Sequence, residues 1–99
     1  MDNSKKILIV DDSIVARMSL RKILSKKFSN IREVSSGTEA IELLKTEQFD
    51  CLLIDYLMPG INGITTIKIL REMGINSPII VISANQQKSI VDKFNELGV

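Results

Sequence analysis

Residues 52–63, LLIDYLMPGING, decide the fold, because they pass from an apolar run through a single aspartate into a turn built from proline and glycine. A continuous apolar run is typical of a parallel strand that is covered on both of its faces. Asp55 stands at the end of this run. The stretch therefore predicts a buried strand that delivers one carboxylate to an edge of a sheet.

Similar apolar runs lie on both sides of this stretch and predict three further strands. Together the expected strands cover residues 6–10, 31–35, 51–54 and 78–82. Each is followed by a segment with helical spacing, at residues 14–27, after Ser36, at residues 63–73 and at residues 86–97. Strands and helices that alternate with short connections predict an α/β fold with a doubly wound parallel sheet, in one domain of residues 1–99.

The expected helices carry recognisable boundary and face signals. Ser36 and Glu39 form a capping-box pattern, in which each side chain can bond the backbone amide of the other residue. Gly74 ends the third helix. The helix of residues 14–27 has an apolar stripe and a basic face expected to point to solvent, the latter made of Arg17, Arg21, Lys22 and Lys26.

Composition excludes several classes of function. The chain has 13 basic and 12 acidic residues, so its net charge of +1 gives no general attraction to nucleic acid or to a membrane surface. It contains no histidine, which rules out histidine-based catalysis within the chain. The single Cys51 cannot form an internal disulfide and fits a reducing, cytoplasmic setting. The apolar run at residues 7–10 is too short for a signal peptide or a membrane span.

Polar residues follow three of the predicted strands at the point where each strand ends. Asp11 and Asp12 follow the first strand, Asp55 the third and Ser83 the fourth. Ligands bind doubly wound sheets beyond the carboxyl ends of the strands, where these residues would converge. Crowded carboxylates repel one another unless a hard cation neutralises them, and Mg²⁺ is the natural candidate. Taken singly, Asp12 could instead cap the first helix, and Ser83 could be an ordinary turn residue without a functional role.

Three segments in order, ILIVDDS, LLIDYLMPGINGI and PIIVISA, resemble the receiver domain of two-component response regulators, in particular the single-domain chemotaxis regulator. The resemblance runs the length of the chain. It implies a flavodoxin-like fold, with strand order 2-1-3-4 for the four βα units expected here.

The resemblance also implies a phosphorelay function rather than an enzyme. Asp55 would accept a phosphoryl group from a phosphohistidine on a sensor histidine kinase or a histidine phosphotransfer protein. Asp12, Asp55 and the backbone carbonyl of Leu57 would ligate Mg²⁺, with Asp11 acting through a water, and the Ser83 hydroxyl would contact the phosphoryl oxygens. Met58, Pro59, Ala84 and Asn85 would border the phosphoryl pocket, and the partner surface would include Ile14, Arg17, Met18 and Arg21.

The sequence departs from the family pattern after the fourth βα unit. Receiver domains continue through a fifth strand, which carries a phosphate-pairing lysine, and a fifth helix, and neither follows here. A sheet truncated to four units would leave the apolar fourth strand unpaired at an edge. We therefore expect self-association, exchange of elements, or a partner that supplies a strand.

Two other functions remain compatible with these residues. The first is a binding module that has the receiver fold but no phosphorylation switch. The second is a Mg²⁺-dependent phosphohydrolase that forms an aspartyl intermediate. Direct binding of nucleic acid is not expected, because no basic recognition helix is present. The output partner is not indicated by the sequence.

Overall fold

The computed structural model of the chain describes residues 5–82, and residues 1–4 and 83–99 lie outside this description. The predicted fourth helix, residues 86–97, falls outside it as well. The described elements alternate as the sequence predicts. In order they are β1 (Lys6–Val10), α1 (Ile14–Leu24), β2 (Asn30–Val34), α2 (Gly37–Leu44), β3 (Cys51–Asp55), α3 (Gly63–Glu72) and β4 (Ile79–Ile82).

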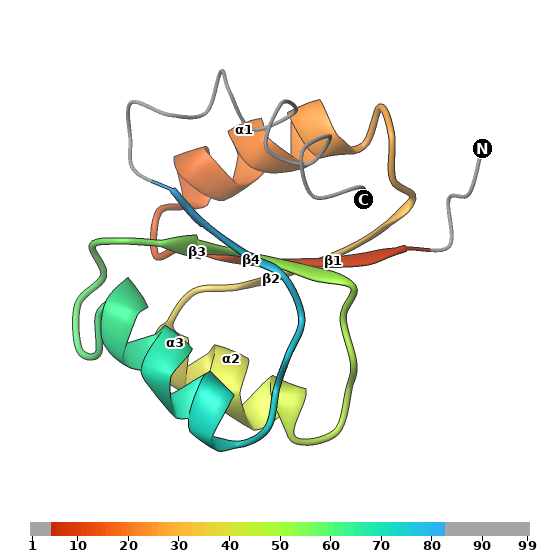
Figure 1. Cartoon of the computed structure of the whole chain (residues 1–99). Helices are drawn as coiled ribbons and strands as arrows, with labels where there is room; N and C mark the ends of the chain where they lie inside the picture. The colour runs from red at the N-terminus through yellow and green to blue at the C-terminus, as the bar shows by residue number, and fades with distance from the viewer. Residues whose placement is uncertain (1–4, 83–99) are drawn as a thin grey trace.

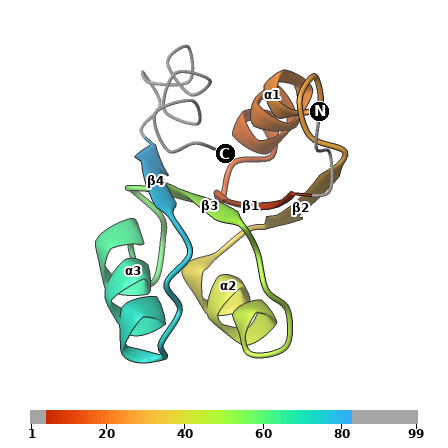
Figure 2. The ribbon, with the colours of Figure 1, turned by 45° about the vertical axis from the view of Figure 1, so that its right-hand side comes forward.

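The four strands form one parallel sheet in the order β2-β1-β3-β4, which confirms the predicted order (Figure 2). Because β1 and β3 are neighbours at the centre, the residues at their carboxyl ends meet. Val10 pairs with Ile54, and Asp55 pairs with Ile82. Within residues 5–82, β4 pairs with β3 alone, so association through the free side of β4 stays a prediction.

Helices cover the two faces of the sheet unequally in the described part of the chain: α1 lies on one face, and α2 and α3 lie on the other (Figure 1). Each face has its own apolar cluster. Ile7, Ile9 and Leu53 pack toward the α1 side, whereas Leu8 and Leu52 pack toward α2 and α3, and all five are fully buried. Alternate residues of one strand thus enter two different cores, which explains why the strand sequences are continuously apolar.

Most predicted boundaries are within one residue of the observed ones, but the predicted end of the first helix is wrong. α1 stops at Leu24 rather than at Lys27. The backbone amides of Lys27 and Phe28 both bond the Leu24 carbonyl, at 3.0 and 2.8 Å. This turn brings Phe28, 2 % exposed, into the cluster beneath α1. Burial of an aromatic ring therefore outweighs one further turn of helix.

The helix starts also correct two sequence interpretations. Ser13, not Asp12, caps α1, because its Oγ accepts a hydrogen bond from the Ala16 amide at 3.1 Å. Ser36 caps α2 as predicted, through a bond from the Glu39 amide at 3.1 Å. The Glu39 carboxylate, however, accepts from the amide and hydroxyl of Ser35, so the reciprocal half of the predicted capping box is shifted by one residue. The shift gives the carboxylate two donors in place of one.

The approach of α2 to α3 gives a first prediction. A Cβ added to Gly37 would lie 2.1 Å from Oγ1 of the buried Thr66 and 2.9 Å from Ile61 Cγ1. Gly37→Ala is therefore expected to lower the free energy of unfolding by about 1–3 kcal/mol, the usual cost of overpacking. Adding Thr66→Ala removes the nearest atom and should recover part of this loss. Urea unfolding of both single variants and the double variant measures the coupling, and strictly additive effects would contradict the predicted contact.

Candidate functional site

Three carboxylates meet at the carboxyl end of the sheet. Asp11 and Asp12 follow β1, and Asp55 is the last residue of β3. One oxygen atom from each residue lies within 4.8 Å of the other two. The central position of β1 and β3 produces this approach, as the parallel arrangement of the predicted strands required.

Asp11 is the most firmly held of the three acids and is only 4 % exposed. Its Oδ1 accepts a hydrogen bond from the Ser13 amide at 2.9 Å. Its own amide donates to the Val34 carbonyl of β2 at 3.2 Å, and its carbonyl accepts from Nη1 of Arg17 at 2.6 Å. Backbone and side chain of Asp11 are therefore fixed from β2 and from α1 at once.

Asp55 is partly buried and is fixed through the loop that follows it. The Leu57 amide donates to its Oδ1 at 3.3 Å. The next residue, Tyr56, extends the pairing to β4 through a bond from its amide to the Ile82 carbonyl at 2.9 Å. Gly63, at the start of α3, returns to this point and donates its amide to the Tyr56 carbonyl at 3.1 Å. The loop between β3 and α3 is thus closed on the end of β3.

The electrostatics of the cluster disfavour three simultaneous negative charges. Burial, followed by the neighbouring charge of Asp11, raises the pKa of Asp55 from its ordinary value of 3.8 to about 6. Burial likewise raises the pKa of Asp11, with the charge of Asp12 acting in the same direction. A hard divalent cation would relieve this repulsion, and the three acids supply the oxygen donors that Mg²⁺ prefers. The three acids thus form a group that could hold such an ion.

The raised pKa of Asp55 gives a second prediction, for the metal-free protein. A carboxyl whose folded pKa of about 6 exceeds its ordinary value of 3.8 lowers the free energy of unfolding as pH rises between these values. Asp55→Asn removes this penalty. After allowance for partial solvent exposure, the variant should be more stable than the wild type by about 1–2 kcal/mol at pH 7.5 in EDTA.

Urea unfolding between pH 3.5 and 7.5 in EDTA measures this effect. The advantage of Asp55→Asn should shrink as pH falls from about 6 to 3.8 and be nearly gone at the acid end of this range, where the carboxyl becomes mostly protonated in folded and unfolded chains alike. A stability difference that is independent of pH would show that charge at this position is not its cause.

The other predicted pocket residues are distributed unevenly. Leu57 is 72 % exposed beside the cluster, and Pro59 is exposed as well. Met58 is 8 % exposed, and its side chain packs in the apolar cluster beneath α2 and α3, so only its backbone remains available to a pocket. Ser83, Ala84 and Asn85 lie outside the described residues.

The predicted partner surface on α1 divides in two. Ile14 and Met18 are 66 % and 65 % exposed, as a docking surface requires. Arg17 and Arg21 instead turn toward Glu33 of β2 and form ion pairs with it. The expectation that Arg17 points to solvent is wrong, since its side chain is only 16 % exposed. Hydrogen bonds to the Glu33 carboxylate on β2 and to the Asp11 carbonyl after β1 hold this side chain against the sheet.

Sequence reasoning missed Ser13 and Arg17 as residues that hold the site. A cap signal was present, because Ser13 directly precedes the first helix. No comparable signal marks Arg17, whose contact with Asp11 depends on how α1 lies against the sheet.

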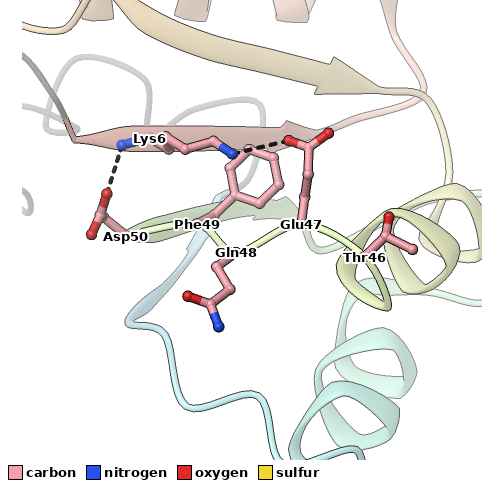
Figure 3. Close-up of a pocket in the computed structure, with 6 residues that line it drawn as sticks. All are labelled: Lys6, Thr46, Glu47, Gln48, Phe49 and Asp50. Atoms are coloured by element: carbon pink, nitrogen blue, oxygen red, sulfur yellow. Dashed lines mark hydrogen bonds and ion pairs between the residues drawn. The ribbon is translucent and has the colours of Figure 1, made fainter.

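A separate cleft of about 480 Å³ opens at the opposite end of the sheet, lined by Lys6, Thr46, Glu47, Gln48, Phe49 and Asp50 (Figure 3). The Lys6 ammonium contacts Glu47 at 3.1 Å and lies 4.8 Å from the centre of the Phe49 ring. The Lys6 amide donates to the Asp50 carboxylate at 2.7 Å. These charged groups already pair with one another, so the cleft is a weaker candidate than the acidic cluster.

No helix within residues 5–82 is both long and apolar enough to cross a membrane.

Comparison with known proteins finds a family model and several relatives that match most of the chain. The family model described as "Response regulator receiver domain" matches residues 7–99. The chemotaxis protein CheY of Thermotoga maritima is 39 % identical over 95 residues, which cover 95 % of this chain and 79 % of that protein. The response regulator MprA of Mycobacterium ulcerans is 35 % identical over 86 residues, which cover 87 % of this chain but only 37 % of MprA.

The fold agrees with these sequence relationships. The receiver domain of the Francisella response regulator 1452 superposes with a TM-score of 0.76 at 30 % identity, over 96 % of this chain and 77 % of that one. The chain is thus similar in sequence to proteins of two kinds, one close to its own length and one much longer.

Proposed function

Because this chain belongs to the response regulator receiver domain family of two-component signalling, we propose that Asp55 accepts a phosphoryl group and thereby switches the chain's interactions with other proteins. Members of this family are phosphoacceptor signalling modules rather than classical enzymes. The observation that carries the proposal is the convergence of Asp11, Asp12 and Asp55 within 4.8 Å.

The proposed reaction transfers a phosphoryl group from a phosphohistidine of a sensor histidine kinase or a histidine phosphotransfer protein. A carboxylate oxygen of Asp55 attacks phosphorus, the phosphorus–nitrogen bond breaks, and its electron pair returns to the imidazole of the donor. The Leu57 amide, 3.3 Å from Oδ1, orients the carboxylate, and the other oxygen would attack. Asp55 thereby becomes an acyl phosphate.

Mg²⁺ fits the donor set at this site. Asp12, Asp55 and the Leu57 carbonyl would hold it, and Asp11 would act through a water. The ion, when bound, supplies positive charge that offsets the charge of the phosphoryl oxygens. Our proposal retains Ser83 as the hydroxyl that contacts these oxygens. Pro59, Ala84, Asn85 and the backbone of Met58 would border the pocket.

The phosphodonor would dock on the amino-terminal part of α1. Ile14, Val15 and Met18 are 66, 73 and 65 % exposed there, and α1 starts three residues after Asp11. Across the acidic cluster, Tyr56 and Leu57 are 49 and 72 % exposed. An apolar rim around a polar centre would exclude water from a bound phosphohistidine. We propose that this transfer takes place in the cytoplasm, and the output partner is not identified.

Thermal unfolding with beryllofluoride, a small mimic of a phosphoryl group, tests the proposal. In Mg²⁺, a concentration a hundredfold above its dissociation constant should stabilise the wild type by about 2.7 kcal/mol. No such gain is expected for Asp55→Asn, or for the wild type in EDTA. A folded wild type that gains nothing in Mg²⁺ would contradict the proposal and favour a binding module that works without phosphorylation.

A further inference from the structure

The peptide that joins Asp11 to Asp12 is held by a side chain from α1. Its carbonyl oxygen accepts a hydrogen bond from Nη1 of Arg17 at 2.6 Å, while the Asp11 amide on the other side donates to Val34 at 3.2 Å. The orientation of this peptide sets the direction in which the Asp12 side chain leaves the backbone. Arg17 is thus in a position to affect the direction of a carboxylate with which it forms no hydrogen bond.

Arg17 is in turn anchored to β2. Its Nε donates to Oε1 of Glu33 at 3.2 Å, and the other oxygen of Glu33 is occupied by Nε of Arg21. Arg21 also donates through Nη2 to the Ile31 carbonyl at 2.9 Å. Arg21, Glu33 and Arg17 therefore form a continuous brace that runs from the β2 backbone to Asp11.

We infer that Arg17 is a positioning residue of the metal site, with Glu33 as its anchor, and that the brace fixes Asp12 for binding of Mg²⁺. The inference rests on the proposed function, because it assigns Asp12 as a ligand. Groups that orient metal ligands without touching the metal typically contribute about 10–100-fold to affinity. Arg17 is suited to this task, because its planar guanidinium donates to Asp11 and Glu33 in fixed directions.

A purely electrostatic role for Arg17 predicts the opposite result. A cation beside the acidic cluster repels Mg²⁺, so the loss of its charge alone would tighten binding. Loss of the fixed peptide orientation would weaken it. The sign of the change therefore distinguishes the two roles.

Calorimetric titration of the metal-free chain with Mg²⁺ tests the inference. Arg17→Lys keeps the charge but not the fork of donors, and Arg17→Met keeps much of the length but not the charge. Both should bind Mg²⁺ about tenfold more weakly than the wild type. The matched control is Lys22→Met, which removes an exposed cation of α1 that lies outside the brace and should stay within about twofold of the wild type. Unchanged or tighter binding in Arg17→Met would overturn the inference.

Folding is checked by thermal unfolding of each variant in EDTA. If Arg17→Met does not fold, Arg17→Lys decides the outcome, and unchanged Mg²⁺ binding in that variant overturns the inference. The titration needs no phosphodonor, so it separates two failures. A wild type that binds Mg²⁺ but not beryllofluoride contradicts the proposed function alone, whereas Arg17 variants with normal Mg²⁺ affinity contradict the positioning role alone. A wild type that binds no Mg²⁺ contradicts both.

Discussion

Gly63→Ala is expected to lower the free energy of unfolding by about 2–4 kcal/mol, the largest loss of stability that we predict. A Cβ at this position would lie 2.4 Å from the Asp55 carbonyl oxygen and 3.1 Å from the Tyr56 Cα. Both atoms belong to the backbone, so no change of rotamer relieves the overlap. Either α3 or the end of β3 must move, and the second movement displaces Asp55. We therefore expect weaker Mg²⁺ binding as well.

Gly74→Ala is the matched control. Gly74 has a φ of +85°, but no atom lies within 4 Å of the position that its Cβ would take. Its replacement should cost only the left-handed backbone strain of about 1–2 kcal/mol and leave Mg²⁺ affinity unchanged. Urea unfolding and Mg²⁺ titration of both variants measure the difference. Normal Mg²⁺ affinity in a destabilised Gly63→Ala would show that α3 moves and that Asp55 does not.

Asp12→Asn is expected to weaken Mg²⁺ binding roughly a hundredfold, the largest functional effect that we predict short of losing the acceptor itself. Removing one charged partner from a close charge pair costs about 3 kcal/mol, and each 1.4 kcal/mol corresponds to a factor of ten. The fold should tolerate the change, because Asp12 is exposed and Ser13 caps α1. Loss of affinity would therefore not reflect unfolding.

Glu42→Gln serves as the control for charge alone. Its side chain is 65 % exposed on α2 and pairs only with Lys45 among the contacts described, at 2.5 Å. This variant loses the same single negative charge as Asp12→Asn but lies outside the acidic cluster. Calorimetry at 0.15 M salt should show wild-type affinity, because screening removes long-range attraction. Equal losses in both variants would mean that overall charge, not ligation, determines Mg²⁺ binding.

The sheet could be predicted from the sequence because its signals are local and mutually consistent. Continuous apolar runs marked β1, β3 and β4, and the acids after β1 and β3 followed from where those runs end. The strand order came from resemblance to a family, not from periodicity. The position of the three acids thus required only parallel strands in the correct order.

The details that sequence did not predict depend on tertiary contacts. α1 ends early because Phe28 returns to the core, and the Met58 side chain packs in the apolar cluster beneath α2 and α3. In the sequence, the pattern of residues around Arg17 resembles that around the solvent-facing basic residues of the same helix. The Arg17 side chain turns toward the sheet because it donates to the Asp11 carbonyl and to the Glu33 carboxylate. Neither acceptor lies on α1, the helix that carries Arg17. Helical periodicity contains no information about such partners.

The most direct test of the proposed function is the intact mass of the chain after incubation with Mg²⁺ and acetyl phosphate. We predict the addition of one phosphoryl group to the wild type and none to Asp55→Asn or to the wild type in EDTA. Addition that persists in Asp55→Asn, or its absence in a folded wild type that binds Mg²⁺, would contradict the assignment of Asp55 as the phosphoacceptor.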